Sequence, residues 1–370
     1  MKTAASMTIS EVGRPLAGLV GLAVFLLFQN PAAAAMTQEE IALYKGADRM
    51  KLIEDGARKE GKVVMYGTLS PNVAVRPLTE AFRKKHPYVE LQNWTGTTGE
   101  IMPKILAERR ANAQVGDVLE WAEGSVPAIR AGAVIPFHAQ AFTDIPEGYR
   151  DPKGFWEATR VSYFGLGYNT KLVAPADVPK TWEDLLNPKF KGKMAWRAGS
   201  EPGAPLFISN LRRFMGEEKA EEYLKKLSAQ GVVNYTSGSA VALVNVIGQG
   251  EYAMGLNIFA NNPIQAAQKG APTDVKMMDP SPTTVSTFQI IRGAPHPYAA
   301  MLFAEFLLWP DGQSVLRDAG YFPANVKVEP DPTYTRVIPR LAAVKENAFT
   351  PEDMIEWSPR SNELWGNYFR

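Results

Sequence analysis

The segment KVVMYGTLSP, residues 62–71, joins a short apolar run to a loop of glycine, threonine, serine and proline. Residues 62–66 predict a buried strand, and the apolar spacing in residues 75–82 predicts a helix with one buried face. The same succession of strand, loop and helix returns at VELQNWTGTTG, residues 89–99, and at GDVLEWAEGS, residues 116–125. Such alternation is typical of a parallel sheet covered by helices.

A second series of predicted strands and helices occupies residues 193–280. The extended aromatic segment FWEATRVSYFGLGYN, residues 155–169, precedes this series, and TVSTFQIIRG, residues 284–293, follows it. We expect both segments to cross between two lobes, since a chain of this length exceeds what one hydrophobic core usually serves. The predicted fold is therefore α/β and two-lobed, each lobe a mostly parallel sheet flanked by helices. The expected bounds are 36–160 for lobe one, 161–285 for lobe two, and 286–370 for the return to lobe one with C-terminal helices.

The first 35 residues have the pattern of a secretory signal peptide. Lys2 and Arg14 precede an apolar run over residues 16–28, which leads into the small-residue tract PAAAA ending at Ala35. The apolar run is shorter than the roughly 20 residues that a membrane-spanning helix requires. We expect cleavage near Ala35 and export to the periplasm.

Charge and cysteine content narrow the function classes. The chain has 40 basic and 39 acidic residues, and without residues 1–35 both numbers become 38. A neutral balance argues against nucleic acid as the main partner, because such binders usually carry a basic excess. Cysteine is absent, so no disulfide and no cysteine-linked lipid contributes to the fold or the anchoring.

Four motifs in order carry a family resemblance: YNTKLV (168–173), PKTWEDLLNPKFKGKMAW (179–196), GEYAMGLN (250–257) and APHPYAAMLFAEFLLWPDGQ (294–313). Together they resemble the extracellular solute-binding proteins of bacterial ABC importers, in the type II branch with ferric-ion, thiamine and phosphonate binders. The similarity extends over residues 62–322. It implies a monomeric binding protein, not an enzyme, without a cofactor, whose partners are a small solute and an inner-membrane permease with its ATPase.

A ligand of such a fold is expected at the carboxyl ends of the strands, where helix amino termini present free amides. Six loops lie at these ends, and most are rich in hydroxyl groups or glycine. The candidate ligand-binding residues in them are Thr68, Ser70, Thr97, Thr98, Trp121, Trp196, Arg197, Ser200, Ser237, Ser239, Asn257 and Phe259.

Hydroxyl groups, helix amides and the fork of Arg197 suit carboxylate, phosphonate or phosphate oxygens. Trp121, Trp196 and Phe259 would form a wall for an apolar or cationic part of the ligand. Each assignment has an alternative. Serine and threonine at a helix start also serve as caps, an arginine at a strand end also forms surface ion pairs, and aromatic residues there also pack in the core.

Ferric-ion binders of this family use two neighbouring tyrosines after the strand that corresponds to residues 252–257. Here that place reads NIFANN, residues 257–262, so Phe259 and Ala260 provide no phenolate. A hard trivalent ion prefers anionic oxygen ligands, and we therefore expect an organic anion, with ferric ion as the alternative.

Other functions remain as further alternatives. The chain could be a sensing subunit for a membrane receptor, or an exported hydrolase that uses paired carboxylates. His86, His138 and His296 have no metal-binding spacing, and no catalytic or metal-ligating residue is predicted.

Overall fold

The computed structural model describes residues 36–122, 124–198, 202–237 and 239–370, and residues Thr37–Arg370 form one compact unit. The predicted signal peptide, residues 1–35, and the candidate Ser200 lie outside the described residues. Among the helices that the structure does describe, none is long and apolar enough to cross a membrane.

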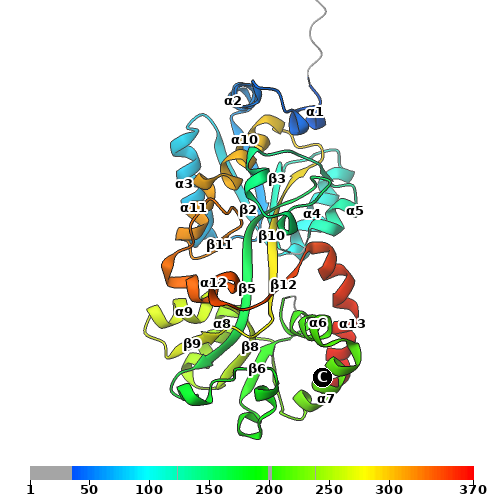
Figure 1. Cartoon of the computed structure of the whole chain (residues 1–370). Helices are drawn as coiled ribbons and strands as arrows, with labels where there is room; N and C mark the ends of the chain where they lie inside the picture. The colour runs from blue at the N-terminus through cyan, green and yellow to red at the C-terminus, as the bar shows by residue number, and fades with distance from the viewer. Residues whose placement is uncertain (1–35, 123, 199–201, 238) are drawn as a thin grey trace, which may run out of the picture. The chain divides into compact units, whose positions relative to one another are not determined.

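Twelve strands of the described chain are joined by backbone hydrogen bonds (Figure 1). They are β1 (Lys62–Gly67), β2 (Glu90–Thr95), β3 (Val118–Trp121), β4 (Val134–Ile135), β5 (Glu157–Asn169), β6 (Met194–Arg197), β7 (Val233–Tyr235), β8 (Met254–Phe259), β9 (Thr273–Lys276), β10 (Ser281–Ile291), β11 (Phe322–Pro323) and β12 (Glu346–Phe349). The main order is β2-β1-β3-β10-β5-β8-β6-β7. The neighbours β2, β1 and β3 are parallel, as are β8, β6 and β7, whereas β5 and β10 run antiparallel to their neighbours in this order. The predicted α/β fold is thus confirmed, with a parallel set of strands on each side of an antiparallel pair.

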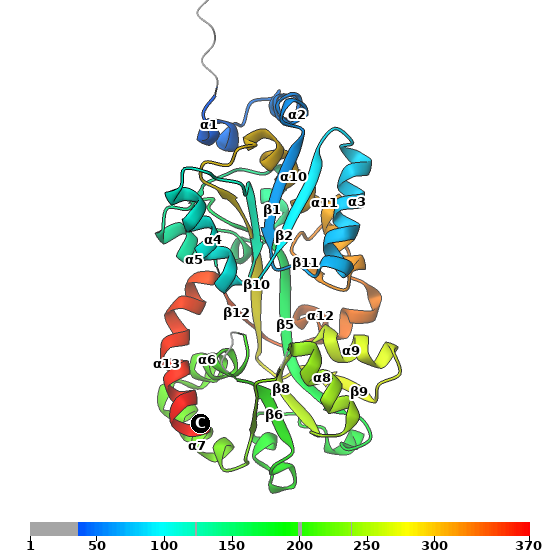
Figure 2. The ribbon, with the colours of Figure 1, turned by 180° about the vertical axis from the view of Figure 1, so that it is seen from behind.

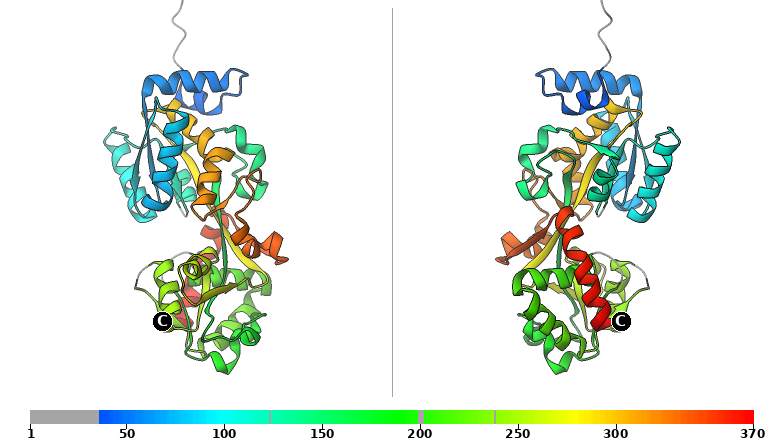
Figure 3. Two further views of the ribbon diagram at one scale, coloured as in Figure 1. Left: turned by 90° about the vertical axis from the view of Figure 1, so that its left-hand side faces the viewer. Right: turned by 90° about the vertical axis from the view of Figure 1, so that its right-hand side faces the viewer.

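The β5–β10 pair connects the two sets of strands. The first half of β5 pairs with β10 through Glu157 to Tyr163, and its second half, from Phe164 to Asn169, pairs with β8 and β9. In Figure 3 the two strands run together between the two groups of helices. The domain bounds expected at residues 160 and 285 fall inside these continuous strands.

Helices cover both sets of strands (Figure 2). They are α1 (Gln38–Leu43), α2 (Arg49–Glu60), α3 (Arg76–Lys85), α4 (Thr98–Arg110), α5 (Ser125–Arg130), α6 (Ala204–Met215), α7 (Glu217–Ser228), α8 (Ala240–Gln249), α9 (Asn261–Gln268), α10 (Pro297–Leu308), α11 (Pro310–Asp318), α12 (Pro339–Ala342) and α13 (Pro351–Phe369). α10 packs against α2, α11 and β1, while the C-terminal helix α13 packs against α6 and α7. The last helix therefore covers the second set of strands, and α10 covers the first.

Two local features complete the fold. α4 begins at Thr98, where Thr97 and Glu100 form a capping box, and Pro103 lies inside this helix. β9 pairs with β5 over residues 273–276.

One acidic residue of β5 is buried without an ion pair. Glu157 is fully buried, and within the described chain neither oxygen of its carboxyl group accepts a hydrogen bond of good geometry, although the nearby amide of Ala139 favours the charged form. Burial, followed by the nearby charge of Glu305, raises the pKa of Glu157 to about 8. The side chain is therefore protonated at neutral pH, which avoids a buried unpaired charge.

We expect Glu157 to make the protein less stable as pH rises. The unfolded chain releases this proton near pH 4.5 and the folded chain near pH 8, so the free energy of unfolding falls across that window. Replacing Glu157 by Gln should remove this contribution. Urea unfolding at pH 5, 7 and 9 should then show the variant gaining stability relative to the parent as pH rises.

The exposed Glu147 serves as a control, since Glu147→Gln should follow the parent at each pH. Parallel stability curves for the parent and Glu157→Gln would contradict a raised pKa at this position.

Candidate functional site

Two neighbouring cavities, of 230 and 100 Å³, lie against the same face of β5. Arg160, Ser162 and Phe259 line both of them, and we refer to the two together as the crossing-strand cleft. The larger cavity is also lined by Ser239, Ala240, Val241, Asn261, Asn262 and Tyr321, and the smaller by Ala122, Pro202, Thr284, Ser286, Phe349 and Met354, among others. The cleft therefore collects side chains from both sets of strands and from the β5–β10 pair itself.

Strand geometry explains why polar side chains gather on this face. Successive residues of a strand point to opposite faces, so Arg160 and Ser162 share one face of β5. In the antiparallel register Ser286 lies opposite Arg160, and Thr284 lies opposite Ser162. Directly paired residues have their side chains on the same face, so these four polar groups form one patch on the floor of the cleft.

Arg160 is the charged group that lines both cavities. Its guanidinium donates through Nε to Oε1 of Glu120 at 3.2 Å and through Nη2 to Oγ1 of Thr68 at 3.4 Å. The guanidinium also lies 4.7 Å from the centroid of the Tyr321 ring. Among the described residues Nη1 has no hydrogen-bond partner, so the outer edge of the guanidinium keeps donors for a ligand.

The carboxylate of Glu120 holds this guanidinium from below. Glu120 is fully buried at the end of β3, and its Oε1 also accepts a hydrogen bond from Oγ1 of Thr159 at 2.8 Å. The loop after β1 is also joined to β3, since the amide of Thr68 donates to the carbonyl of Glu120 at 2.9 Å. Arg160 is thus fixed by its inner edge while its side chain stays 12% exposed.

Two helix starts border the larger cavity. The first residues of α8, Ala240, and of α9, Asn261, both line it, and the first amides of a helix lack partners within the helix. At α8 one of these amides is satisfied, because Oγ of Ser239 accepts from the amide of Ala242 at 3.3 Å. No described side chain caps α9, so its first amides and the positive end of its dipole face the cavity.

Three candidates from the sequence lie in or beside the cleft. Ser239 and Phe259 line it, and Phe259 packs on Phe164 with ring centroids 4.6 Å apart. Thr68 contacts Arg160 without lining a cavity.

The two tryptophan candidates are core residues and do not line the cleft. Trp121 is fully buried, and its Nε1 donates to Oε1 of Gln289 at 2.9 Å. Trp196 is also fully buried, donates to Oδ1 of Asn234 at 2.8 Å and packs against Phe207. Trp121 ends β3 and Trp196 is the last residue but one of β6, and both side chains lie in the core, outside the candidate cleft.

Asn257 and Thr97 have local structural partners. Asn257 adopts a positive φ of 54°, and its Nδ2 donates to the carbonyls of Pro202 and Gly203, which anchors the turn before α6. The amide and hydroxyl of Thr97 both donate to Oε2 of Glu100 at 2.8 Å, so Thr97 serves as a helix cap.

The remaining candidates lie at element ends away from the two cavities. Ser70 precedes the π-helical turn η1 (Pro71–Val75), Thr98 is the first residue of α4, Arg197 is the last residue of β6, and Ser237 is exposed before α8. The two cavities thus bring together fewer of the sequence-based candidates than expected.

The polar residues in the middle of the crossing strands were not predicted from the sequence, because strands were expected to contact a ligand only at their ends; these residues are Arg160, Ser162, Thr284 and Ser286. The sequence RVSYF, residues 160–164, contains a pattern that could have identified them. Polar and apolar residues alternate there, and Arg160 is the charged residue in the middle of that strand. Asn261 and Asn262 also line the larger cavity and are not among the residues predicted from the sequence.

Metal-binding geometry is absent from the described residues. No group of three or more histidine, cysteine, aspartate or glutamate side chains in that part of the chain could hold a metal ion. Tyr321 is the tyrosine among the residues that line the two cavities.

We expect Ser239 to contribute to stability as the cap of α8. Ser239→Ala removes the acceptor for the Ala242 amide and should lower the free energy of unfolding by about 0.5–2 kcal/mol, measured by urea denaturation. Ser237→Ala is the matched control, since this exposed serine makes no cap, and it should unfold like the parent. Equal stability of both variants would show that the Ser239 hydroxyl caps nothing.

Comparison with known proteins agrees with this architecture. The family profile described as "Bacterial extracellular solute-binding protein" matches residues 127–341. An uncharacterised protein of Haemophilus influenzae is 25% identical over 299 residues, which cover 76% of this chain and 83% of that protein. A protein of Salmonella typhi named "Putative 2-aminoethylphosphonate-binding periplasmic protein" is 29% identical over 172 residues, 45% of this chain and 49% of that protein.

Among solved structures, iron-bound HitA from Pseudomonas aeruginosa superposes with a TM-score of 0.70 at 20% sequence identity, over 84% of this chain and 99% of that chain. This likeness shows the fold and agrees with the predicted type II periplasmic-binding architecture. The family profile covers more than half of the chain, and the family consists of binders rather than enzymes, as predicted. The chain belongs to the bacterial extracellular solute-binding proteins.

Proposed function

We propose that this protein is the periplasmic binding component of an ABC importer and that the crossing-strand cleft holds a small organic anion of the phosphonate or carboxylate class. The observation that carries the ligand class is Arg160, a guanidinium that lines both cavities and keeps donors free on its outer edge. A guanidinium binds two oxygens of such an anion in a planar, two-pronged geometry.

The surroundings of Arg160 supply further donors without a titratable base. Ser162 lies on the same face of β5, and the uncapped start of α9 brings the amides near Asn261 and Asn262 to the same cavity. Helix amino termini and hydroxyl groups favour anionic oxygens. Phe259 provides an apolar wall between the two cavities, suited to the carbon part of an organic anion.

Glu120 supports this reading by its position. A carboxylate in the cleft would repel an anion, but Glu120 is fully buried beneath Arg160 and accepts from its Nε. The ion pair therefore orients the guanidinium while the cationic edge faces the cavities. A polar group held by a second layer of hydrogen bonds binds with less loss of side-chain entropy.

The relatives support the same class. The Salmonella typhi protein is named for 2-aminoethylphosphonate, a small organic molecule with an anionic phosphonate group. The matched segment covers 49% of that protein. In this proposal the protein closes by a hinge motion when the solute binds, because contacts that the solute makes only in the closed form favour closure. The partners of this proposal are the solute and a permease with its ATPase, and the binding protein acts as a monomer in the periplasm.

Ferric ion is the alternative that the structural likeness raises, since HitA was solved with iron bound. The described residues that line the cleft include one tyrosine, Tyr321, and its ring faces the cation of Arg160. A trivalent cation prefers several anionic oxygens, and a fixed guanidinium beside them would repel it. These features favour the organic anion.

The test is calorimetric titration of the purified protein with 2-aminoethylphosphonate, methylphosphonate, acetate, succinate and ferric citrate. We expect a phosphonate or carboxylate to bind, and Arg160→Gln to weaken it by about 10- to 100-fold, since hydrogen bonds to charged groups are worth about 1.5–3 kcal/mol. The double variant Glu120→Gln/Arg160→Gln should bind as weakly as the single variant, while avoiding a buried unpaired carboxylate.

Arg130, an exposed arginine at the end of α5, gives the matched control, and Arg130→Gln should bind like the parent. Tight binding of ferric ion would contradict the proposed ligand class. So would an anion that binds Arg160→Gln with the same affinity as the parent.

A further inference from the structure

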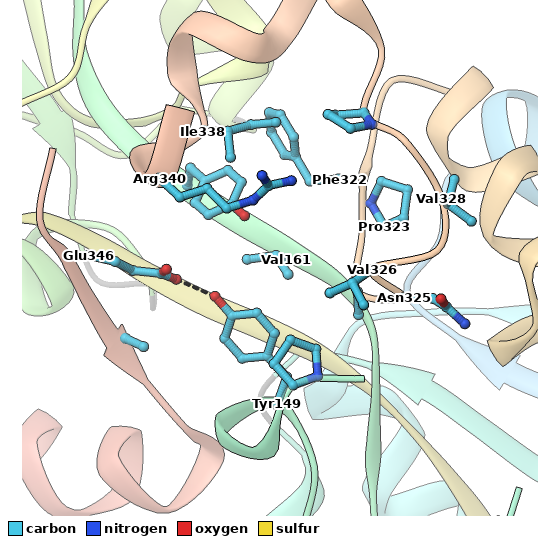
Figure 4. Close-up of a pocket in the computed structure, with 15 residues that line it drawn as sticks. Tyr149, Val161, Phe322, Pro323, Asn325, Val326, Val328, Ile338, Arg340 and Glu346 are labelled. Carbon is cyan, nitrogen blue, oxygen red and sulfur yellow. Dashed lines mark hydrogen bonds between the residues drawn. The ribbon is translucent and has the colours of Figure 1, made fainter. Parts of the chain in front are cut away.

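Another and larger cavity, of 390 Å³, lies beside β5 (Figure 4). This volume lies within the range of about 300–1,000 Å³ that is usual for small-molecule sites. Its walls come from β5, from the residues around β11, from the segment that ends in α12, and from β12. We refer to it as the back pocket.

The back pocket and the cleft border each other at β5. Val161 and Phe322 line both the back pocket and the larger cavity of the cleft. Arg160 and Ser162 line the cleft alone, whereas Tyr163, which points to the other face of β5, lines the back pocket alone. The two sites therefore share part of an apolar wall but differ in their polar groups.

One side of the back pocket is apolar. Val161, Phe322, Val328 and Ile338 are buried and line it, and Val326 lines it while remaining 61% exposed. A solvent-exposed valine at the mouth of an apolar cavity leaves apolar surface for a ligand to cover. The wall suits a branched or aromatic hydrocarbon group.

The other side carries one cation and one anion that do not pair with each other. Figure 4 shows the guanidinium of Arg340 and the carboxylate of Glu346 pointing into the same space. Among the described residues Arg340 has no hydrogen bond or ion pair. Oε1 of Glu346 accepts from the hydroxyl of Tyr149, and its Oε2 has no described partner. Two unlike charges at one cavity, each with free capacity, match a ligand that carries both signs.

A third polar group is buried at the same place. Tyr163 is only 8% exposed, and its hydroxyl has no hydrogen-bond partner within the described chain. Burial, followed by the charge of Glu346, raises the pKa of Tyr163, while Arg340 opposes this shift. The hydroxyl therefore stays protonated and is available as a donor beside Arg340. The oxygen of this hydroxyl is accessible although most of the ring is buried, so a ligand in the pocket can reach it.

We propose that the back pocket is a second binding site that takes a small zwitterion with an apolar side chain, the chemistry of a hydrophobic α-amino acid. Arg340 and the hydroxyl of Tyr163 receive the carboxylate, Oε2 of Glu346 receives the ammonium group, and the wall around Val161 and Phe322 receives the side chain. This site does not depend on the anion proposed for the cleft.

The experiment is calorimetric titration of the mature protein with three matched probes that share one phenyl group. L-Phenylalanine has both charges, 3-phenylpropionate lacks the ammonium group, and phenethylamine lacks the carboxylate. We expect saturable binding of L-phenylalanine, weaker by about tenfold or more for either singly charged probe, because each loses one charge-assisted contact. Arg340→Gln and Glu346→Gln should each weaken L-phenylalanine binding by a similar factor.

Two variants locate the binding. Lys327→Gln, at an exposed lysine beside the pocket mouth, should leave it unchanged. Arg160→Gln removes the charge of the cleft, and L-phenylalanine should still bind if the back pocket holds it. Loss of binding in Arg160→Gln with retention in Arg340→Gln would place the molecule in the cleft and overturn the proposal. Equal affinity for 3-phenylpropionate, or no saturable heat for L-phenylalanine, would overturn it as well.

Discussion

The antiparallel pairing of β5 with β10 is the constraint on which the other features depend. β5 pairs with β10 through its first half and with β8 and β9 through its second half, so one continuous backbone belongs to both sets of strands. Because the side-chain period of a strand is two, a slip of one residue in β5 would exchange its two faces. The same register thus places Arg160 and Ser162 in the cleft and Tyr163 in the back pocket. A single strand thereby defines two chemically different cavities.

The buried ion pair of Glu120 and Arg160 shows how a charged group can be held at such a junction. Moving either ion out of water costs several kcal/mol, and this cost is offset only when the geometry is good and further hydrogen bonds are present. Here Thr159 and Thr68 supply such bonds on either side of the pair. The outer edge of the guanidinium is left without a partner from the described chain. The pair is therefore better understood as a device for orienting Arg160 than as a source of net stability.

The sequence was sufficient for the fold and predicted some of the residues that line the candidate cleft. Strand, loop and helix alternate with clear periodicity from residue 62 onward, and aromatic, extended segments correctly marked β5 and β10 as the crossing strands. Loop chemistry at strand ends predicted Ser239 and Phe259, and both line the candidate cleft. It failed for Trp121 and Trp196, because the direction in which a side chain points at the end of a strand depends on the register with neighbours. It also failed for Arg160, whose partners Glu120 and Tyr321 lie far away in the sequence and meet it only in the folded chain.

The most direct test of the account is a crystal structure of the protein with the organic anion that binds most tightly. We expect two oxygens of the anion within about 2.7–3.2 Å of the nitrogens on the outer edge of Arg160, with the carboxylate of Glu120 still bonded to Nε. Density for the anion at another place in the protein, with Arg160 contacting no ligand atom, would contradict it.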